Sequence, residues 1–336
     1  MTDSAFDCVF RADGGPGFGF GHLRRCFVLA EALKRNGIKK IAFISKTKQA
    51  AETVLNKRFP VIKISARKHE TDFFCQYFKK NIPKLLIVDS YKINAKTLSS
   101  FQKLCPVVIF DDTGSRTHYS IDGIINYNVH ATTINYACAD HTRLLLGTQY
   151  VPIDSSFKKL VHKRKNIHKM RLFISLSGML PAKCLKKINR VLTQLQGPLL
   201  IDTTSGLAHN QTLQKNDVHV NWLPFQEANN VMAKADMALC AAGVTSYELA
   251  FLGIPLLITS IVKNHEPLAR WLDKLGTAKN IGSFVKLSDK KILNEIERFI
   301  DDNRGREQMS QKQRRLIDGL GSDRLAKKII QYWIGS

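Results

Sequence analysis

Disulfide, zinc and export signals are missing from this chain of 336 residues. Its seven cysteines form no C-x-x-C pair, are odd in number and lie mostly beside apolar runs, which favours reduced core residues over a disulfide framework or a structural zinc site. Residues Met1–Asp7 are polar and form no leader with an apolar stretch, so we expect a cytoplasmic protein. The longest apolar region, Met237–Val262, is broken by Glu248 and by Gly253-Ile254-Pro255, which predicts two strands flanking a helix instead of a membrane span.

The common nucleotide and metal motifs are absent as well. No G-x-G-x-x-G is followed by an acid at the ribose-binding distance, and no P-loop is present. Asp89, Asp111 and Asp112 follow apolar runs, but no clustered His or Glu completes a ligand shell around them. We therefore expect no metal and no cofactor, and we interpret these aspartates as capping or turn residues.

The formal net charge of +23 is the outlier of the composition. Such a charge attracts anionic ligands, nucleic acids or acidic membrane surfaces without selecting among them. The basic residues are spread along the chain and form neither a sustained basic helix nor a strand with interleaved aromatic residues. We expect no nucleic-acid binding, while weak association with acidic membranes stays open; the sequence indicates no oligomeric state.

Short apolar runs alternate with helical patterns along most of the chain, which predicts parallel βαβ units. We expect an α/β protein of two Rossmann-like, doubly wound domains that face each other across a cleft. The first covers residues 1–154 and the second residues 170–320, joined by a polar linker over 155–169. The last residues, 321–336, predict a helix that packs back toward the first domain.

The glycine-rich segment Arg11–Cys26 ends in Gly21-His22, where apolar residues begin to recur at helical spacing up to Gly37. A helix N-terminus disfavours a positive imidazole, so we expect His22 to be mostly neutral and able to accept a proton. An imidazole far from the pocket, or held in an ion pair with a buried acid, would contradict this role. The alternative is an ordinary β-to-α connection with an exposed histidine.

Other polar groups follow predicted strands, where ligands of such folds bind. Tyr91 comes two residues after Asp89 and is either a cleft residue or a partly buried aromatic. In Ala238–Pro255, the small-residue turn at Gly243, Val244 and Thr245 is suited to a diphosphate, with Glu248 on the first turn of the helix as an acceptor for ribose hydroxyls. A plain helix N-cap is the alternative there, as it is for Asn264.

These motifs together resemble the PseG family of UDP-sugar hydrolases in pseudaminic acid biosynthesis, the related SpsG proteins of spore-coat polysaccharide pathways and, in the second half, MurG-type glycosyltransferases. The resemblance implies a GT-B fold and metal-independent water attack at the anomeric carbon of a UDP-linked diacetamido-trideoxy sugar. It implies that His22, Tyr91 and Asn264 are catalytic. The residues implied to bind substrate are Arg11, Asp13, Gly19, Gly21, Gly178, Gly243, Val244, Thr245, Glu248 and His265.

Two positions depart from the family. Ser177-Gly178-Met179-Leu180 stands where the family usually has Gly-Gly-[Ser/Thr]-Asp, and His265 stands where glutamine is common. Two other functions stay open: an inverting GT-B glycosyltransferase in which His22 deprotonates an acceptor hydroxyl, and a non-catalytic nucleotide-sugar binder.

Overall fold

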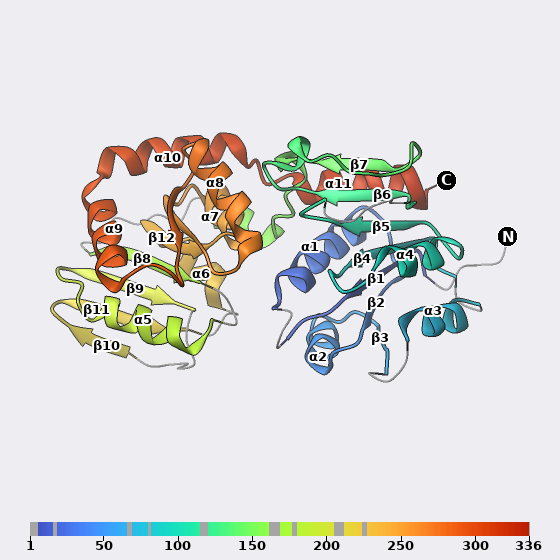
Figure 1. Cartoon of the computed structure of the whole chain (residues 1–336), viewed down its shortest axis with the longest axis horizontal. Helices are drawn as coiled ribbons and strands as arrows, with labels where there is room; N and C mark the ends of the chain where they lie inside the picture. Colours follow the sequence, from blue (N-terminus) through green and yellow to red (C-terminus); the bar gives the residue numbers. More distant parts are fainter. Residues whose placement is uncertain are drawn as a thin grey trace. The chain divides into compact units, whose positions relative to one another are not determined.

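The computed structural model describes residues 6–15, 19–65, 69–79, 82–114, 120–160, 169–176, 180–204, 212–223 and 227–335. The chain divides into two compact units (Figure 1). The first unit comprises Met1–Pro152 together with Leu320–Ser336, and the second comprises Ile153–Gly319.

The first unit is built on a seven-stranded parallel sheet with the strand order β3-β2-β1-β4-β5-β6-β7. Its strands are β1 (Cys8–Ala12), β2 (Ile41–Ser45), β3 (Val61–Lys63), β4 (Leu85–Asp89), β5 (Val107–Phe110), β6 (Gly123–Asn126) and β7 (Arg143–Leu146). The order reverses between β1 and β4, and ligands of such sheets bind beyond the carboxyl ends of the strands at that reversal.

Helices cover both faces of this sheet because its central strands are apolar on both sides. One core joins Val9 and Leu86 to Phe74 and Phe101, while Phe10 faces the other way and stacks on Phe43 beside Phe27. The helices are α1 (Gly21–Arg35), α2 (Lys48–Asn56), α3 (Glu70–Phe78), α4 (Ala95–Gln102) and α11 (Gly321–Ile329). The predicted end of α1 is confirmed, since Gly37 has a φ of +97° directly after the C-cap.

The C-terminal segment packs on the first unit. A Cβ at Gly321 would lie 2.2 Å from the Val151 carbonyl oxygen, so only glycine permits this approach of α11. At its other end the segment continues as a π-helix, Ile330–Ile334, whose Trp333 lies against Gly123. Arg35 of α1 and Asp323 of α11 form an ion pair of 2.8 Å.

The second unit also has a seven-stranded sheet, ordered β10-β11-β9-β8-β12-β13-β14. Its strands are β8 (Met170–Ser175), β9 (Leu199–Thr203), β10 (Thr212–Lys215), β11 (Val218–Trp222), β12 (Met237–Ala241), β13 (Leu256–Ser260) and β14 (Lys279–Ser283). All pairs are parallel except β10 and β11, which a tight turn at Asn216-Asp217 connects as a hairpin. The order reverses between β8 and β12.

The helices of the second unit are α5 (Ala182–Leu192), α6 (Ala228–Met232), α7 (Val244–Leu252), α8 (Glu266–Lys274), α9 (Asp289–Asp301) and α10 (Asn303–Leu316). α10 ends at Leu316, and Gly319 follows it with a φ of +73°. The expected linker is structured at its start, because Ser155–Lys159 form a 3₁₀ helix with Phe157 buried.

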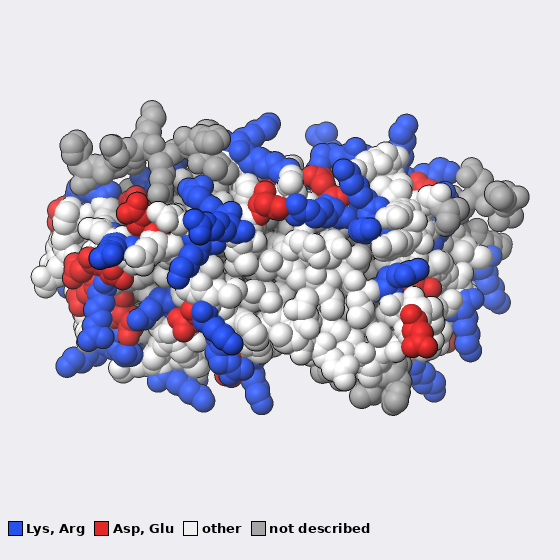
Figure 2. Space-filling model, turned by 90° about the horizontal axis from the view of Figure 1, so that it is seen from above, with Lys and Arg blue, Asp and Glu red and all other residues white. Residues whose placement is uncertain are grey.

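Surface charge is dispersed over the face in Figure 2, where Lys and Arg side chains are interspersed with Asp and Glu. None of the helices in the described ranges has the length and hydropathy of a membrane span. All seven cysteines are free, and Cys8, Cys26, Cys105, Cys184 and Cys240 are buried.

Candidate active site

His22 and Asp89 meet at the strand-order reversal of the first sheet. β1 leads through the glycine-rich turn into α1, where His22 is the second residue, and Asp89 is the last residue of the neighbouring β4. Because β1 and β4 are parallel neighbours, their carboxyl ends bring the two side chains together although 67 positions separate them.

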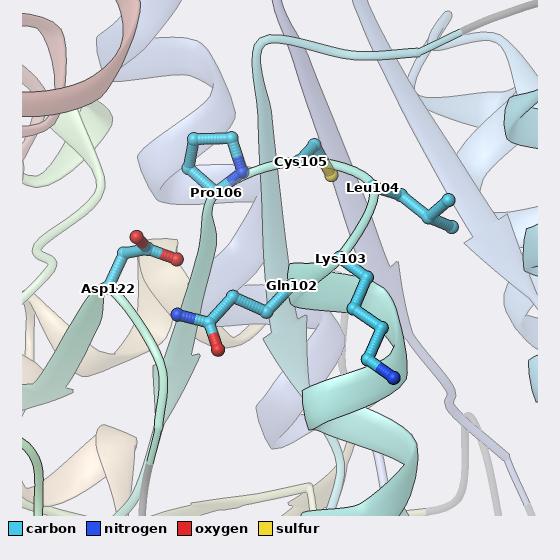
Figure 3. A pocket seen from close by; sticks show the side chains of 6 residues that line it. All are labelled: Gln102, Lys103, Leu104, Cys105, Pro106 and Asp122. Atoms are coloured by element: carbon cyan, nitrogen blue, oxygen red, sulfur yellow. The ribbon is translucent and has the colours of Figure 1, made fainter.

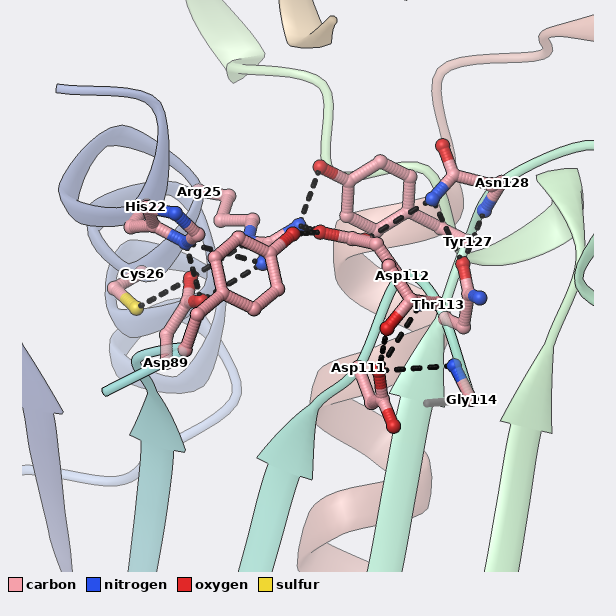
Figure 4. Close-up of polar contacts among 12 residues, drawn as sticks. His22, Arg25, Cys26, Asp89, Asp111, Asp112, Thr113, Gly114, Tyr127 and Asn128 are labelled. Carbon is pink, nitrogen blue, oxygen red and sulfur yellow. Dashed lines mark hydrogen bonds and ion pairs between the residues drawn. The ribbon is translucent and has the colours of Figure 1, made fainter. Parts of the chain in front are cut away.

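The His22 imidazole is held by the buried Asp89 carboxylate (Figure 4). Nδ1 lies 2.6 Å from Asp89 Oδ1, and the His22 side chain is 20% exposed against 1% for Asp89. An ionised carboxylate only accepts hydrogen bonds, so Nδ1 carries the proton and Nε2 is the nitrogen that gains or loses one. No hydrogen bond to Nε2 is present within the described ranges.

This geometry corrects the sequence-based prediction for His22. That prediction assigned the state of the imidazole to the helix N-terminus alone and named a buried acid partner as contrary to a role as base. The acid partner is present, but Arg25 also pairs with it, donating from Nε to Oδ2 (2.6 Å) and from Nη2 to Oδ1 (2.7 Å). The carboxylate thus has a cation of its own, and its bond to Nδ1 orients the ring as the aspartate of a hydrolase triad does.

Arg25 joins two carboxylates at the centre of this cluster. Its Nη1 donates to both oxygens of Asp112 at 2.9 Å and to the Tyr127 hydroxyl at 3.1 Å, and its guanidinium lies 4.6 Å from the Phe110 ring centroid. Burial opposes ionisation of both partners, yet Arg25 holds the pKa of Asp89 well below its usual range. Asp112 and Asp89 in turn raise the pKa of Arg25 against the effect of burial.

The expected capping or turn role of the aspartates is therefore wrong for two of them. Asp89 and Asp112 accept side-chain hydrogen bonds within the Arg25 cluster. Asp111 does form a turn, since its Oδ1 accepts from the backbone N–H groups of Thr113 and Gly114. Within the described ranges, no group of three or more His, Cys, Asp or Glu is arranged to hold a metal ion.

Tyr91 completes the cluster on its exposed side. Its ring meets the His22 ring edge-on, with centroids 4.9 Å apart, and its hydroxyl donates to Asp112 Oδ2 at 2.5 Å. Loss of water around the hydroxyl and the adjacent Asp112 carboxylate raise the pKa of Tyr91. The residue as a whole is 46% exposed.

Arg11 and Asp13, two further predicted substrate-binding residues, have protein partners. Both are buried; Arg11 pairs with Glu70 (2.6 Å) and Asp13 (2.7 Å), and Asp13 accepts from the backbone N–H of Lys46. These contacts fix the start of the glycine-rich turn, and their binding of substrate stays a prediction.

Gly19 and Gly21 line the end of that turn. Gly19 has a φ of +70° and exchanges backbone hydrogen bonds with Gly15, and Gly21 is the first residue of α1. A Cβ at either position would meet nothing within 4 Å, which leaves open space beside the backbone next to His22.

The predicted nucleotide turn lies at the strand-order reversal of the second sheet. Gly243 follows β12 and is the N-cap of α7, and the next two residues, Val244 and Thr245, are half-buried. A Cβ at Gly243 would meet nothing within 4 Å. Gly178 would belong to the neighbouring turn after β8 but lies outside the described residues. Glu248 is not on the first turn of the helix as expected, because α7 begins at Val244, and its side chain is buried.

Asn264 and His265 follow β13, the strand beside β12. Asn264 is exposed within the 3₁₀ helix Lys263–His265 and does not cap α8, whose N-cap is His265. The Ile261 N–H donates to His265 Nδ1 at 3.4 Å, and burial lowers the pKa of His265 to about 4. His265 is therefore a neutral side chain at the same edge as the Gly243 turn.

A hollow of about 380 Å³ lies at the opposite edge of the first sheet, away from this chemistry (Figure 3). Its lining comes from the end of α4 and the residues before β5 and β6: Gln102, Lys103, Leu104, Cys105, Pro106 and Asp122. It has none of the predicted site residues, so the cluster around His22 is the candidate active site.

Known proteins that are similar to this chain in sequence include the two described next, whereas no family model matches it. Spore coat polysaccharide biosynthesis protein SpsG of Bacillus subtilis is 22% identical over 322 residues, which span 92% of this chain and 94% of SpsG. A Helicobacter pylori protein is 25% identical over 264 residues, 78% of this chain and 46% of that protein. It is named pseudaminic acid cytidylyltransferase and UDP-2,4-diacetamido-2,4,6-trideoxy-beta-L-altropyranose hydrolase. The chain is a distant homologue of both.

Solved structures identify the fold of this chain. MurG of Acinetobacter baumannii matches with a TM-score of 0.69 at 16% identity, over 97% of this chain and 99% of MurG. The calicheamicin glycosyltransferase CalG4 matches with a TM-score of 0.64 at 15% identity, over 97% of this chain and 98% of CalG4. UDP-GlcNAc 2-epimerase of Neisseria meningitidis, in a structure bound to UDP-GlcNAc, matches with a TM-score of 0.59 at 14% identity, over 96% of this chain and 100% of the epimerase. The predicted fold of two parallel-sheet α/β domains of GT-B type is thus confirmed.

Proposed function

We propose that the protein hydrolyses a UDP-linked amino sugar of the diacetamido-trideoxy class and releases UDP, with His22 as the general base. The observation that carries the proposal is the Asp89-held imidazole at the strand-order reversal of the first sheet. The proposal is supported by the homologue in Helicobacter pylori, which is named as a hydrolase of such a UDP-sugar.

The reaction needs one proton acceptor and one stabilised leaving group. A water oxygen attacks the anomeric carbon, the bond from that carbon to the diphosphate oxygen breaks, and His22 Nε2 takes the proton of the water. UDP leaves with the bonding electron pair. Asp89 keeps Nδ1 protonated throughout, so Nε2 is always the accepting atom.

The second unit is assigned the nucleotide in this proposal. Backbone N–H groups at the start of α7 favour an anionic diphosphate, and Gly243 leaves room for it. Asn264, exposed after β13, is assigned to the sugar or to water, and His265 to the sugar.

The test is UDP release from the UDP-sugar in the absence of any acceptor. We expect wild-type turnover, and a loss of roughly 100-fold or more for His22→Ala. His141→Ala is the matched control, because His141 is exposed and lies outside the cluster. Equal rates for both variants would contradict the assignment of His22.

Glycosyl transfer is the second candidate, favoured by the fold shared with CalG4. A transferase would release no UDP from the UDP-sugar alone and would begin turnover when an acceptor is added. A non-catalytic binder would bind UDP-sugar without release under either condition.

A further inference from the structure

We propose that Asp112 is a positioning residue which turns the Tyr91 oxygen into a hydrogen-bond acceptor for the nucleophile, and that this favours water over an alcohol. The inference rests on the proposed hydrolysis and deepens it. It concerns a residue outside the predicted set of site residues.

The Asp112 carboxylate is fixed from three sides. Arg25 donates to both of its oxygens at 2.9 Å, Asn128 Nδ2 donates to Oδ1 at 3.0 Å, and the Tyr91 hydroxyl lies 2.5 Å from Oδ2. Figure 4 shows Arg25 and Asn128 directed at the Asp112 carboxylate. A carboxylate so surrounded by donors acts as an acceptor in every contact.

The hydroxyl of Tyr91 has one proton, and that proton is directed at Asp112. Its remaining lone pairs face away from the carboxylate, on a residue that is 46% exposed. Tyr91 can thus accept a hydrogen bond from a ligand but has no second proton to donate.

The proposal assigns two acceptors to one nucleophile, because the rings that carry them are in edge-on contact. His22 Nε2 accepts a proton in the proposed reaction, and the Tyr91 ring contacts the His22 ring at 4.9 Å. A water molecule has two O–H donors and can bond to both while a lone pair faces the anomeric carbon. An alcohol has one O–H donor and leaves one acceptor unsatisfied, which costs binding free energy. The pair therefore favours hydrolysis over transfer.

Asp112→Asn tests this arrangement against Tyr91→Phe. The amide would donate to the tyrosine oxygen and release its proton toward the ligand, so we expect kcat to fall about 10- to 100-fold with little change in KM. In a Tyr91→Phe background the same substitution should cost less than about 3-fold, because Asp112 acts through Tyr91. Equal losses in both backgrounds would show a merely structural role and overturn the proposal.

Product partition gives a readout that structural damage would not move. With methanol present, we expect the wild type to yield free sugar, and Asp112→Asn and Tyr91→Phe to yield a larger share of methyl glycoside. Asp111→Asn is the matched control, since Asp111 accepts from the Thr113–Gly114 turn instead of Tyr91. An unchanged product ratio in both variants would overturn the proposal.

The hydrogen bond itself is measured without turnover, by NMR of the protein with ¹³Cζ-labelled tyrosine. The Tyr91 signal, assigned by its loss in Tyr91→Phe, should resist ionisation to a higher pH than exposed tyrosines and titrate earlier in Asp112→Asn. An ordinary Tyr91 titration in the wild type would overturn the proposal. Absent UDP release with a normal NMR result for Tyr91 would instead contradict the proposed hydrolysis.

Discussion

Pairing among buried charges fixes the side chains of the candidate site. Arg25, Asp89 and Asp112 come from three different elements, and a buried ion left without its partners costs several kcal/mol. The carboxylates that pair with Arg25 also accept hydrogen bonds from His22 and Tyr91, so the same ion pairs fix the positions of both rings. One sequence signal pointed to it: Arg25 follows His22 by three residues, which places both on one face of a helix. The partners 64 and 87 positions away required the strand order.

Asp89→Asn should separate catalysis from nucleotide binding. The amide no longer fixes the imidazole tautomer, so we expect kcat for UDP release to fall about 1,000-fold or more, while UDP affinity measured by calorimetry stays unchanged. Because Arg25 loses a buried counter-ion, stability should fall by about 3 kcal/mol at neutral pH.

The pH dependence of Asp89→Asn gives a second check. The folded pKa of Asp89 lies below its ordinary value, so its stabilisation is present above about pH 4 and is lost as the pH falls. Denaturation curves of wild type and variant should therefore converge on acidification. A stability difference that persists at low pH would contradict the ion pair.

The lowered pKa of His265 also makes stability depend on pH, but here the folded state favours the neutral form of the side chain. Its folded pKa of about 4 lies below the ordinary value of about 6.5, so the unfolded chain binds the proton first and the folded state loses stability as the pH falls through that window. At pH 5 the loss is at most about 2 kcal/mol. Urea denaturation at pH 7.5 and pH 5 should show this loss in the wild type and a smaller one in His265→Gln; equal losses would refute it.

The continuity of an apolar run decides whether a strand can be predicted from the sequence. The central strands of both sheets are continuous apolar runs such as LLIVD and MALCA, and such runs are the signal on which the predicted βαβ units rest. β7, β10 and β14 lack such a signal, because RLLL, TLQK and KNIGS carry polar or glycine residues at a sheet edge; β6 is apolar but only four residues long. The antiparallel hairpin of β10 and β11 lies outside the predicted parallel βαβ units.

Gly321→Ala should weaken the docking of α11. Its Cβ would lie 2.2 Å from a backbone oxygen that cannot move aside, so we expect a loss of about 1–3 kcal/mol in the stability of the first unit. Gly21→Ala is the matched control: Gly21 also opens a helix, but its Cβ would meet nothing within 4 Å. In thermal denaturation, we expect a lower melting temperature for Gly321→Ala and an unchanged one for Gly21→Ala. A stable Gly321→Ala protein would refute the close approach.

In each unit of the molecule, predicted site residues lie at the point where the strand order of the sheet reverses. The His22–Asp89 pair lies at the reversal between β1 and β4, and the Gly243 turn at the reversal between β8 and β12. This is why strand-end motifs located the candidate site from the sequence. These motifs do not reveal which partner each side chain contacts. The local sequence around Asp89 is the same whether its carboxylate caps a turn or accepts a hydrogen bond from the His22 imidazole.

The net charge of the whole molecule predicts only weak membrane association. A charge of +23 attracts anionic lipid, but the basic side chains are interspersed with acidic ones on the face in Figure 2, so we expect salt to screen the attraction. We expect sedimentation with phosphatidylglycerol vesicles at about 0.01 M salt, where the Debye length is about 30 Å, and release at about 0.15 M salt, where it is about 8 Å. Phosphatidylcholine vesicles are the control and should bind nothing at either salt concentration. Retention on anionic vesicles at the higher salt would instead indicate a specific lipid site, because a contact that survives screening needs directed hydrogen bonds or buried apolar area.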